Sequence, residues 1–535
     1  MKILRPVPII LVVFDGLVAT AIMDENREID AIRYPNFARL AAHAHWFQHT
    51  TTVHPRTDHA VPAILSGRYP TDSTRPVLAN YPQNLFTLLQ QSGQYEATIF
   101  EPYTRLAPPE FEERPPVRSI LEQVQVSLEC LARVYVRICL PENIVSISVP
   151  IPRTWFSLPD SFTISRGQHN GILRYGWDRE RHIQVAHFLE TLTKRAEPHL
   201  WFFHVGLPHY PFRYYPSGQA YVQDIPVSFP LPGTRGDLSE NWGDDQFAVD
   251  QAWQRYLLQV GYADRVLGQI LERLESCDMF DQSLLVVTSD HGYSFRANLP
   301  QRAPRPETLP DVMPVPLFVK LPGQTSGSTS DRNIETIDIL PTIADVIGFA
   351  FPQPIDGESA FATTRARLRK TLVAPGGTIG VEAVFPRADE SRQRMLTRFG
   401  SGRDDRLWTV DVRPEMVGRE VDSFPRSSLA TRELIFPLQS YRPRLTSEDR
   451  VNYFLLEGAL EDWEDQNPPV FIAVASAGRI IAVTRTFLEP EYAHCWNALL
   501  PEDAVPGGVE SLEFWEVLDV AGNVELRACK THPPK

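Results

Sequence analysis

The sequence predicts an α/β protein whose mostly parallel central sheet is sandwiched by helices and is followed by a smaller, β-rich C-terminal domain. Apolar runs of strand length alternate with helical patterns over roughly residues 8–350, as in parallel sheets that are covered on both faces. Beyond Asn452 short β-like runs replace this alternation. A chain of 535 residues is also too long for one compact core. We therefore predict a first domain at 1–360, a connecting segment at 361–440 and a β-sandwich-like domain at 441–535.

Strands and helices are expected to alternate along the first domain. Ile9–Phe14 is an uninterrupted apolar run, which is typical of a strand buried on both faces. Pro35 stands near the start of a helical pattern, where proline is tolerated. The expected strands are Ile9–Phe14, Tyr95–Glu101, Leu200–Val205, Leu284–Thr288 and Val315–Lys320. The expected helices are Pro35–Ala41, Thr57–Leu65, 119–140 (with a proline-punctuated insertion up to about Pro159), Gln246–Glu275 and Ile337–Ile347.

The last third of the chain is expected to turn into β-structure. Residues 361–440 are rich in arginine and have few long apolar runs, as expected for a connecting layer. The β-like runs are Phe471–Val474, Arg479–Thr484 and Val509–Leu518. Because a Ser-Ala-Gly turn separates the first two of these runs, we predict a hairpin there.

The composition excludes several classes of protein. The formal net charge of −14 argues against a nucleic-acid-binding protein, which would need a basic face. The five cysteines stand at positions 130, 139, 277, 495 and 529, an odd number without any Cys-x-x-Cys pair. We therefore expect neither a disulfide framework nor a zinc cluster, and we expect the thiols to be buried apolar groups.

The apolar stretch Val7–Met23 could suggest a signal peptide or a membrane span. A transmembrane helix needs about 20 apolar residues, and Asp15 interrupts this stretch in its middle. Cleavage after the Ala-Thr-Ala at 19–21 would remove the predicted first strand. We therefore expect a buried strand, and the sequence carries no clear signal peptide or transmembrane helix that would assign a compartment.

Polar residues follow three of the expected strands. Asp15, His209 and Asp290 each come just after a strand, and ligands of parallel sheets bind at the carboxyl ends of strands. Thr57 opens a helix, whose unpaired N–H groups favour an anion. Taken singly, such an aspartate is often a turn residue and such a threonine a helix cap. Together with His291, which follows Asp290, they predict a common site.

The predicted ligands of this site are Asp15, Thr57, Asp290 and His291, which would hold one divalent metal ion. Carboxylates and a hydroxyl suit a hard cation. The imidazole shifts the preference toward zinc or manganese, with calcium and magnesium as alternatives.

Two motifs around these residues resemble the alkaline phosphatase superfamily, and within it the sulfatase-like branch. The stretch Thr57–Pro70 ends in Ser-Gly-Arg-Tyr-Pro, which is similar to the end of the sulfatase nucleophile helix. Counting back from Gly67 places Thr57 where sulfatases carry a Cys or Ser that matures to formylglycine. Val12–Gly16 and Val286–Gly292 end in the matching Asp and Asp-His.

Other segments extend the resemblance and also limit it. Thr57-x-x-x-Val-Pro is similar to phosphoethanolamine transferases, which use an unmodified threonine, and His209–Phe212 resembles the histidine segment of lipoteichoic acid synthases. Ile337–Thr342 is typical of sulfatase-like domains, so the resemblance covers about residues 8–350. Gly16 replaces the second aspartate of sulfatases, and Thr57 makes formylglycine chemistry an unsuitable model.

The resemblance implies a metal-dependent hydrolase or transferase that acts on phosphate or sulfate esters through a covalent Thr57 intermediate. It implies that His209 contacts the transferred group or protonates the leaving oxygen. His204, His59 and Lys320 are the expected substrate contacts, with a buried, satisfied histidine as the alternative for His204 and a solvated lysine for Lys320. The expected substrate is a small-molecule, glycan or lipid-linked phosphate or sulfate ester, and no nucleic acid is expected.

Two other functions are alternatives. A two-metal phosphodiesterase would need a further Asp and two His, and no Asp-x-x-x-His stands in the middle segment. A non-catalytic binding protein on a decayed scaffold is disfavoured because all four predicted metal ligands are present. Relatives of this branch are often membrane-anchored with an extracytoplasmic catalytic domain, whereas this chain begins at the catalytic domain, so membrane association and oligomeric state stay open.

Overall fold

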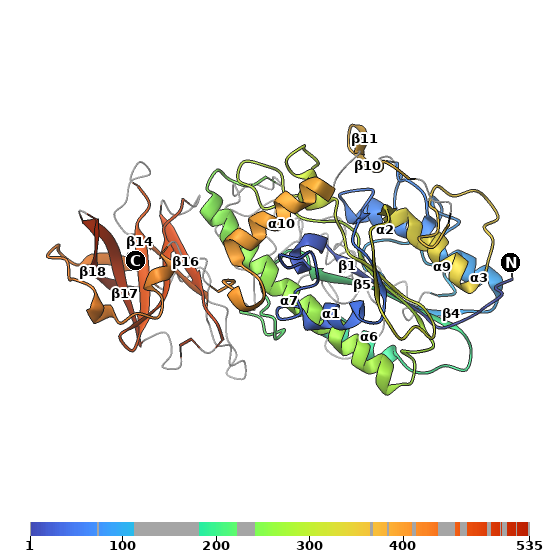
Figure 1. Cartoon of the computed structure of the whole chain (residues 1–535), viewed down its shortest axis with the longest axis horizontal. Coiled ribbons are helices and arrows are strands. Elements are labelled where there is room, and N and C mark those ends of the chain that lie inside the picture. Colours follow the sequence, from blue (N-terminus) through green and yellow to red (C-terminus); the bar gives the residue numbers. More distant parts are fainter. Residues whose placement is uncertain are drawn as a thin grey trace, which may run out of the picture.

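The protein consists of a larger α/β part and a smaller β-rich part at opposite ends of its long axis, as the computed structural model shows (Figure 1). The structure describes residues 2–71, 74–111, 181–221, 241–363, 367–381, 385–408, 413–436, 455–460, 468–488, 494–502, 504–505, 511–520 and 522–532. The predicted helix at 119–140 and the insertion up to about Pro159 lie outside these residues.

The central sheet has seven strands in the order β4-β5-β1-β6-β7-β2-β8. Strands β4, β5, β1 and β6 run parallel, while β7 is antiparallel to β6 and β2 is antiparallel to β7. The bounds are β1 Ile9–Asp15, β2 His45–Phe47, β4 Glu96–Phe100, β5 His199–Pro208, β6 Leu284–Ser289, β7 Leu317–Lys320 and β8 Ser328–Ser330. The predicted fold class, a mostly parallel sheet between helices, is confirmed.

Strand β1 occupies the middle of the sheet and is buried along its whole length. Ile10, Val12 and Phe14 point into the hydrophobic core on one face. Their neighbours in sequence point into the core on the other face. This alternation explains why an uninterrupted apolar run was the correct signal, because both faces of the strand need apolar side chains.

Helices cover both faces of this sheet (Figure 1). Helices α1 Pro35–Ala41, α6 Arg181–Thr191 and the 31-residue α7 Gln246–Ser276 pack on one face. Helices α2 Thr57–Ser66, α3 Leu85–Ser92 and α9 Ile339–Ile347 pack on the other. The remaining elements of this part are β3 Thr50–Thr51, β9 Ile334–Glu335, α8 Leu309–Val312, and short 3-10 helices at Ala19–Ile22 and Thr336–Asp338.

The C-terminal sheet also has seven strands, in the order β15-β14-β17-β18-β12-β13-β16. The bounds are β12 Arg432–Ile435, β13 Leu455–Leu460, β14 Phe471–Ser476, β15 Arg479–Arg485, β16 Cys495–Leu499, β17 Leu512–Val520 and β18 Asn523–His532. The predicted hairpin is present, because β14 and β15 pair across a turn in which Ala477 and Gly478 both have positive φ.

This sheet curls toward a barrel instead of forming the two stacked layers of the expected sandwich. Its two edge strands approach each other: the backbone groups of Phe487 and Cys495 exchange hydrogen bonds of 2.8 and 2.9 Å. The Thr484 hydroxyl of β15 donates to the carbonyl of Asn497 in β16 at 2.7 Å. Bringing the edges together satisfies backbone groups that an open sheet would leave exposed.

Residues 361–440 are divided between the two parts of the molecule. The hairpin of β10 Lys370–Ala374 and β11 Gly377–Val381 packs against α8 of the α/β part. Helix α10 Phe385–Phe399 also packs on that part, while β12 joins the C-terminal sheet. Short 3-10 helices lie at Gly402–Asp404, Pro414–Met416 and Val421–Ser423. The domain boundaries stay a prediction.

The α/β part contacts the C-terminal part through helix α7 and through Tyr215, which precedes it. The Tyr215 hydroxyl donates to the carbonyl of Leu500 at 3.2 Å, and Arg485 forms an ion pair with Asp245 at the start of α7. Arg255 of α7 lies 4.0 Å from Glu457 of β13, and the Arg255 side chain is almost wholly buried. Burial raises the pKa of Glu457 to about 7, with Arg255 opposing the shift.

We expect the free energy of unfolding of the protein to fall as the pH rises from 5 to 8, because of Glu457. The folded pKa of Glu457 lies above its ordinary value of 4.5, so the folded protein holds a proton that the unfolded chain releases in this range. The stabilising contribution is therefore complete below pH 4.5 and lost above pH 7. The free energy of unfolding should fall between pH 5 and pH 8 by up to about 3 kcal/mol more in the wild type than in Glu457→Gln. Parallel pH profiles would contradict this prediction.

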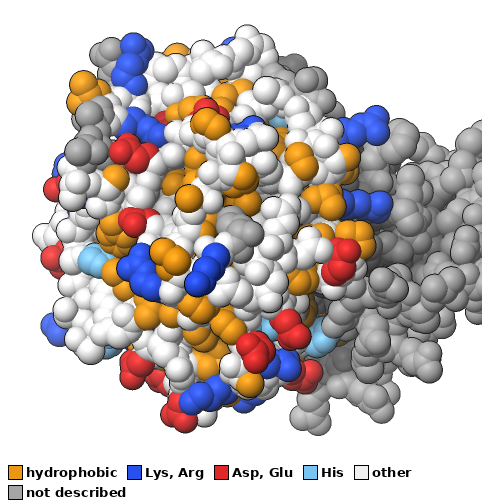
Figure 2. Space-filling model, turned by 90° about the vertical axis from the view of Figure 1, so that its right-hand side faces the viewer, with side chains coloured by type: hydrophobic (Ala, Val, Ile, Leu, Met, Phe, Trp, Pro, Cys, Tyr) orange, Lys and Arg blue, Asp and Glu red, His pale blue; other side chains and the backbone are white. Residues whose placement is uncertain are grey.

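The end of the molecule that carries the N-terminus has a mixed surface. Figure 2 shows hydrophobic side chains scattered between charged ones on this face. Strand β1 starts near this end and runs toward the middle of the molecule (Figure 1). Among the described residues, no helix is both long and apolar enough to cross a membrane.

Candidate active site

The predicted metal ligands come together at the carboxyl end of β1. Asp15 ends this strand, Asp290 and His291 follow β6, and Thr57 is the first residue of α2. The Thr57 hydroxyl lies 3.4 Å from Asp15 Oδ2 and 3.3 Å from His291 Nε2. His291 Nε2 is also 3.6 Å from Asp15 Oδ1 and 3.6 Å from Asp290 Oδ2. The structure therefore gathers all four residues around one point.

Two more histidines face the same point. His204 of β5 has Nε2 3.6 Å from Asp15 Oδ2 and 4.0 Å from Asp290 Oδ2. His209, just after β5, has Nε2 3.9 Å from Asp15 Oδ1. His204 therefore lies among the predicted metal ligands, whereas the sequence suggested a substrate contact or a satisfied histidine.

The three imidazole rings are oriented in the same way. Nδ1 of His209 lies 2.8 Å from the carbonyl of Tyr210, and Nδ1 of His291 lies 2.9 Å from that of Gly292. Nδ1 of His204 lies 3.0 Å from a Glu101 carboxylate oxygen. Because each Nδ1 can donate to its acceptor, Nε2 is the ring nitrogen that faces Asp15 in all three histidines. Metal-ligating histidines are held in this manner.

Buried polar atoms without a hydrogen-bond partner mark the centre of the cluster. These atoms are Asp15 Oδ1, Asp290 Oδ2 and His204 Nε2. Asp15, His209 and His291 form one group, and Asp15, His204 and Asp290 form another; within each group the ligand atoms lie within 4.8 Å of one another. Because leaving such atoms unpaired is costly, this donor set fits a metal cation.

The charges of the cluster shift the pKa values of its members. Burial raises the pKa of the Asp290 carboxyl, and Asp15 adds to the shift. Burial also opposes ionisation of Asp15, but the imidazoles of His209 and His204 outweigh it and lower that pKa. Burial lowers the pKa of His209 to about 4. Burial would do the same to His204, but Glu101 and Asp15 outweigh it and raise that pKa. The carboxylates of Asp15, Asp290 and Glu101 thus favour a positive charge within the cluster.

Part of the chain that carries this cluster is similar to known proteins. The family model described as Sulfatase matches residues 133–349. The endo-4-O-sulfatase of Bacteroides thetaiotaomicron is 27% identical over 132 residues, which are 24% of this chain and 25% of that protein. The multifunctional alkaline phosphatase superfamily protein PehA of Trinickia caryophylli is 28% identical over 119 residues, 22% of each chain.

The chain is therefore similar to the sulfatase-like branch of the alkaline phosphatase superfamily. Its matches span about a quarter of the length of these curated relatives. Among solved structures, a phosphonate monoester hydrolase from Silicibacter pomeroyi is similar, with a TM-score of 0.45 and 18% identity. This similarity covers 74% of this chain and 83% of that one.

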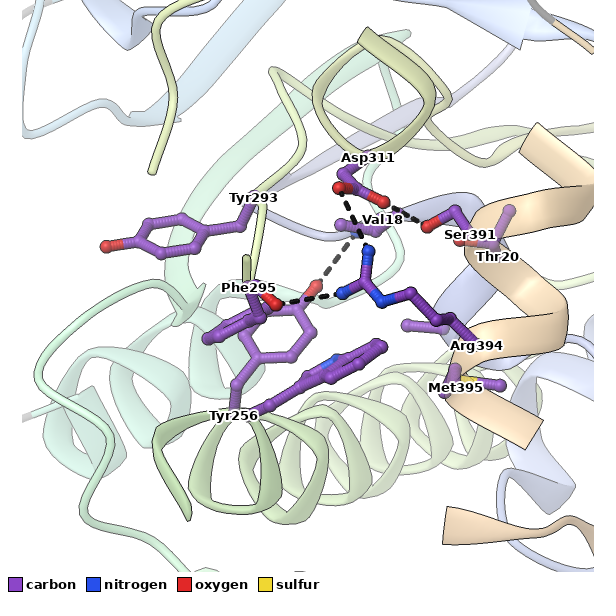
Figure 3. Close-up of a pocket in the computed structure, with 11 residues that line it drawn as sticks. Val18, Thr20, Tyr256, Tyr293, Phe295, Asp311, Ser391, Arg394 and Met395 are labelled. Carbon is purple, nitrogen blue, oxygen red and sulfur yellow. Dashed lines mark hydrogen bonds and ion pairs between the residues drawn. The ribbon is translucent and has the colours of Figure 1, made fainter. Parts of the chain in front are cut away.

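The backbone that carries Asp15 in this sulfatase-like site is fixed from α7. The Tyr256 hydroxyl donates to the carbonyl of Gly16 at 2.9 Å and accepts from the N–H of Val18 at 3.0 Å. Figure 3 shows Tyr256 reaching Val18 beside a small pocket. Gly16, where sulfatases have a second aspartate, has a φ of 75°, a backbone conformation that favours glycine.

The loop that carries His209 is held by two residues that sequence reasoning missed. Arg181 of α6 donates to the carbonyls of His209 at 2.9 Å and Tyr210 at 3.0 Å. Gln259 of α7 donates to the carbonyls of Pro208 at 3.0 Å and His209 at 2.8 Å. Gln259 lies in an expected helix, whereas α6, which carries Arg181, was not predicted. Nothing in the sequence distinguishes either residue from an ordinary polar position.

The structure places His59 beside the cluster. Its Nδ1 lies 2.8 Å from the carboxylate of the neighbouring Asp58, and its ring stacks on that of His54 at 4.3 Å. His59 follows the start of α2 by two residues, so it stands next to Thr57 without joining the three-ligand groups. Its role as a substrate contact stays a prediction.

Lys320 does not fit its predicted role as a substrate contact. It ends β7, and because β7 is antiparallel to β6 it pairs with Leu285 near the start of β6. Its Nζ donates to the carbonyls of Phe280 and Asp281, the latter at 2.9 Å. Lys320 therefore lies at the opposite end of the strands from Asp290. Burial lowers the pKa of Lys320 to about 8.

Replacing Lys320 by methionine is expected to change stability and leave catalysis intact. The variant loses two hydrogen bonds from a charged donor, which should cost about 1–3 kcal/mol of unfolding free energy. KM for an ester substrate should stay within about twofold of the wild-type value, because uniform substrate binding is untouched. A large rise in KM at unchanged stability would restore the substrate-binding role.

Proposed function

We propose that this chain is a metal-dependent hydrolase that cleaves sulfate or phosphate esters with Thr57 as its nucleophile. The observation that carries the proposal is the buried set of unpartnered Asp15, Asp290 and His204 atoms, with the Thr57 hydroxyl beside it. Similarity to the sulfatase-like branch supports sulfate ester hydrolysis, and the relatives named above include a sulfatase.

Asp15, Thr57, Asp290 and His291 would hold one divalent ion, with zinc or manganese favoured by the imidazole. A bound ion would polarise the ester and lower the pKa of the Thr57 hydroxyl. The protein's own residues keep this arrangement in place. The N–H groups of Gly16 and His291 donate to Asp290 Oδ1 at 3.0 and 2.7 Å, which leaves Oδ2 for the cation.

Thr57 would attack the ester. Its hydroxyl, 3.4 Å from Asp15 and 3.3 Å from His291, would release its proton to solvent as the Oγ1–S or Oγ1–P bond forms. The bond to the leaving alcohol would break, and the leaving oxygen would take a proton from His209 or from water. The first turn of α2 offers backbone N–H groups to the anionic group. His209, whose side chain is 18% exposed, would contact the transferred group. Water then attacks the Thr57 adduct, releasing sulfate or phosphate and restoring the hydroxyl.

A transferase is the second candidate because Thr57 is an unmodified hydroxyl residue. The adduct is then an ordinary ester, which an acceptor alcohol can attack instead of water. Hydrolysis and transfer share the first step and differ only in this attacking group.

The test is a paired assay of metal-stripped and metal-loaded protein on a nitrophenyl sulfate and the matching nitrophenyl phosphate. The loaded protein should hydrolyse at least one of them, and the stripped protein should lose that activity. Adding glycerol separates the two candidates: a hydrolase releases free anion in proportion to nitrophenol, whereas a transferase forms a glycerol ester. Full activity in stripped protein would contradict the proposal.

A further inference from the structure

We infer that His204 is a metal ligand and that Glu101 is the positioning residue that orients its ring. This inference rests on the proposed function, because it requires a cation in the cluster. It adds a second imidazole to the predicted set of Asp15, Thr57, Asp290 and His291.

The position of His204 in the sheet directs its ring into the cluster. His204 pairs with Val13 in the neighbouring β1, two residues before Asp15. Its side chain is 0% exposed, and its Nε2 has no hydrogen-bond partner. Ligand atoms bonded to one ion at about 2.1 Å stand roughly 3–4 Å apart. The separations of 3.6 Å from Asp15 Oδ2 and 4.0 Å from Asp290 Oδ2 agree with this spacing.

Backbone hydrogen bonds hold the Glu101 carboxylate in place independently of His204. One of its carboxylate oxygens accepts from the N–H groups of Tyr103 at 2.8 Å and Thr104 at 3.0 Å. The other oxygen lies 3.0 Å from His204 Nδ1, and the Glu101 side chain is only 4% exposed. A carboxylate that takes the Nδ1 proton leaves Nε2 free to bond a metal and makes it more basic.

The two roles considered from the sequence explain this geometry less well. A substrate contact needs an accessible atom, whereas the His204 side chain is wholly buried with the Tyr103 ring 5.2 Å away. A satisfied structural histidine would have hydrogen bonds at both nitrogens, whereas Nε2 has none and lies 3.6 Å from the nearest Asp15 oxygen. A ligand role accounts for both the burial and the missing partner.

A second imidazole ligand changes which metals the site should prefer. Two imidazoles beside two carboxylates and a hydroxyl make the site less suited to calcium or magnesium, which prefer oxygen ligands. Zinc and manganese should therefore bind more tightly than calcium.

The variant His204→Gln, with Glu101→Gln beside it, tests the assignment. His199→Gln is the matched control, because His199 is a buried histidine on the same strand that bonds Thr98 at 2.8 Å, outside both three-ligand groups. Each protein is stripped and titrated with zinc against a chromophoric chelator. X-ray absorption of the zinc-loaded proteins counts the imidazoles bound to the ion.

We expect His204→Gln to weaken zinc binding at least 10-fold and to lower the imidazole count by one. Glu101→Gln should weaken binding about 10-fold or more without lowering the count, as losses of outer-shell partners do. His199→Gln should match the wild type in both readouts. Unchanged affinity and unchanged count in His204→Gln would overturn the inference.

Where His204→Gln does not fold, the spectra of the wild type and of His209→Gln decide the question, because His209 and His291 could also supply two imidazoles. Two imidazoles that remain in His209→Gln support the inference. A single imidazole in the wild type, or a count that falls to one in His209→Gln, overturns it. A wild-type protein that binds no zinc or manganese would overturn the proposed function itself. The failure of the inference and the failure of the proposed function therefore give different results.

Discussion

Replacing Thr57 by alanine is expected to reduce kcat/KM for an ester substrate by about 10³-fold or more. The hydroxyl is the only group at the start of α2 that lies within 3.4 Å of both Asp15 and His291 in the part of the chain that the structure describes. Without it no covalent adduct can form. The measurement is steady-state turnover of the metal-loaded variant on the substrate that the wild type cleaves best.

Thr57→Ser is the matched control, because it keeps the hydroxyl and removes only a methyl group. It should retain activity within about tenfold, and mass spectrometry of the quenched enzyme should detect one added sulfuryl or phosphoryl group in it and in the wild type. Thr57→Ala should show no such adduct. Full turnover by Thr57→Ala would remove Thr57 from the mechanism, because water would then have to attack the ester directly.

The sequence predicts the parts of the site that depend on local pattern. The apolar runs of β1 and β6 identify buried parallel strands, and the polar residue that ends such a strand lies at the edge where ligands bind. This rule holds for Asp15, Asp290 and His291. In the structure His291 Nε2 lies 3.6 Å from an oxygen of each aspartate. The same logic finds His209 but underrates His204, because a histidine inside a strand carries no local sign of its partners.

The rule fails for Lys320 for a geometric reason. β7 is antiparallel to β6, so the end of β7 lies beside the start of β6. It is therefore far from the carboxyl end of β6, where Asp290 and His291 lie. Strand direction depends on pairing between distant segments, which an apolar run does not reveal. Arg181 and Glu101 are invisible for a similar reason, since their contacts cross 28 and 103 residues of sequence. The curled C-terminal sheet likewise depends on β12, which pairs with β18 almost a hundred residues later.

Metal binding is expected to stabilise the wild type and to fail in Asp290→Asn. The asparagine keeps an acceptor for the N–H groups of Gly16 and His291 but removes one negative charge from the cluster. The wild type should bind one equivalent of zinc or manganese, measured by elemental analysis. At a free metal concentration 1,000 times Kd the ion should add about 4 kcal/mol to the unfolding free energy. Asp290→Asn should gain almost none.

The stripped proteins should show the opposite order of stability. Burial and the neighbouring Asp15 both raise the pKa of Asp290, so the empty wild-type site holds carboxylates that disfavour each other. Stripped Asp290→Asn should therefore unfold at the same temperature as stripped wild type or higher, while loaded wild type exceeds both. Two equivalents per chain would favour the two-metal phosphodiesterase, which the two ligand groups sharing Asp15 could serve. No binding and no shift would favour the non-catalytic scaffold, because the unpartnered carboxylates would then have no cation to balance them.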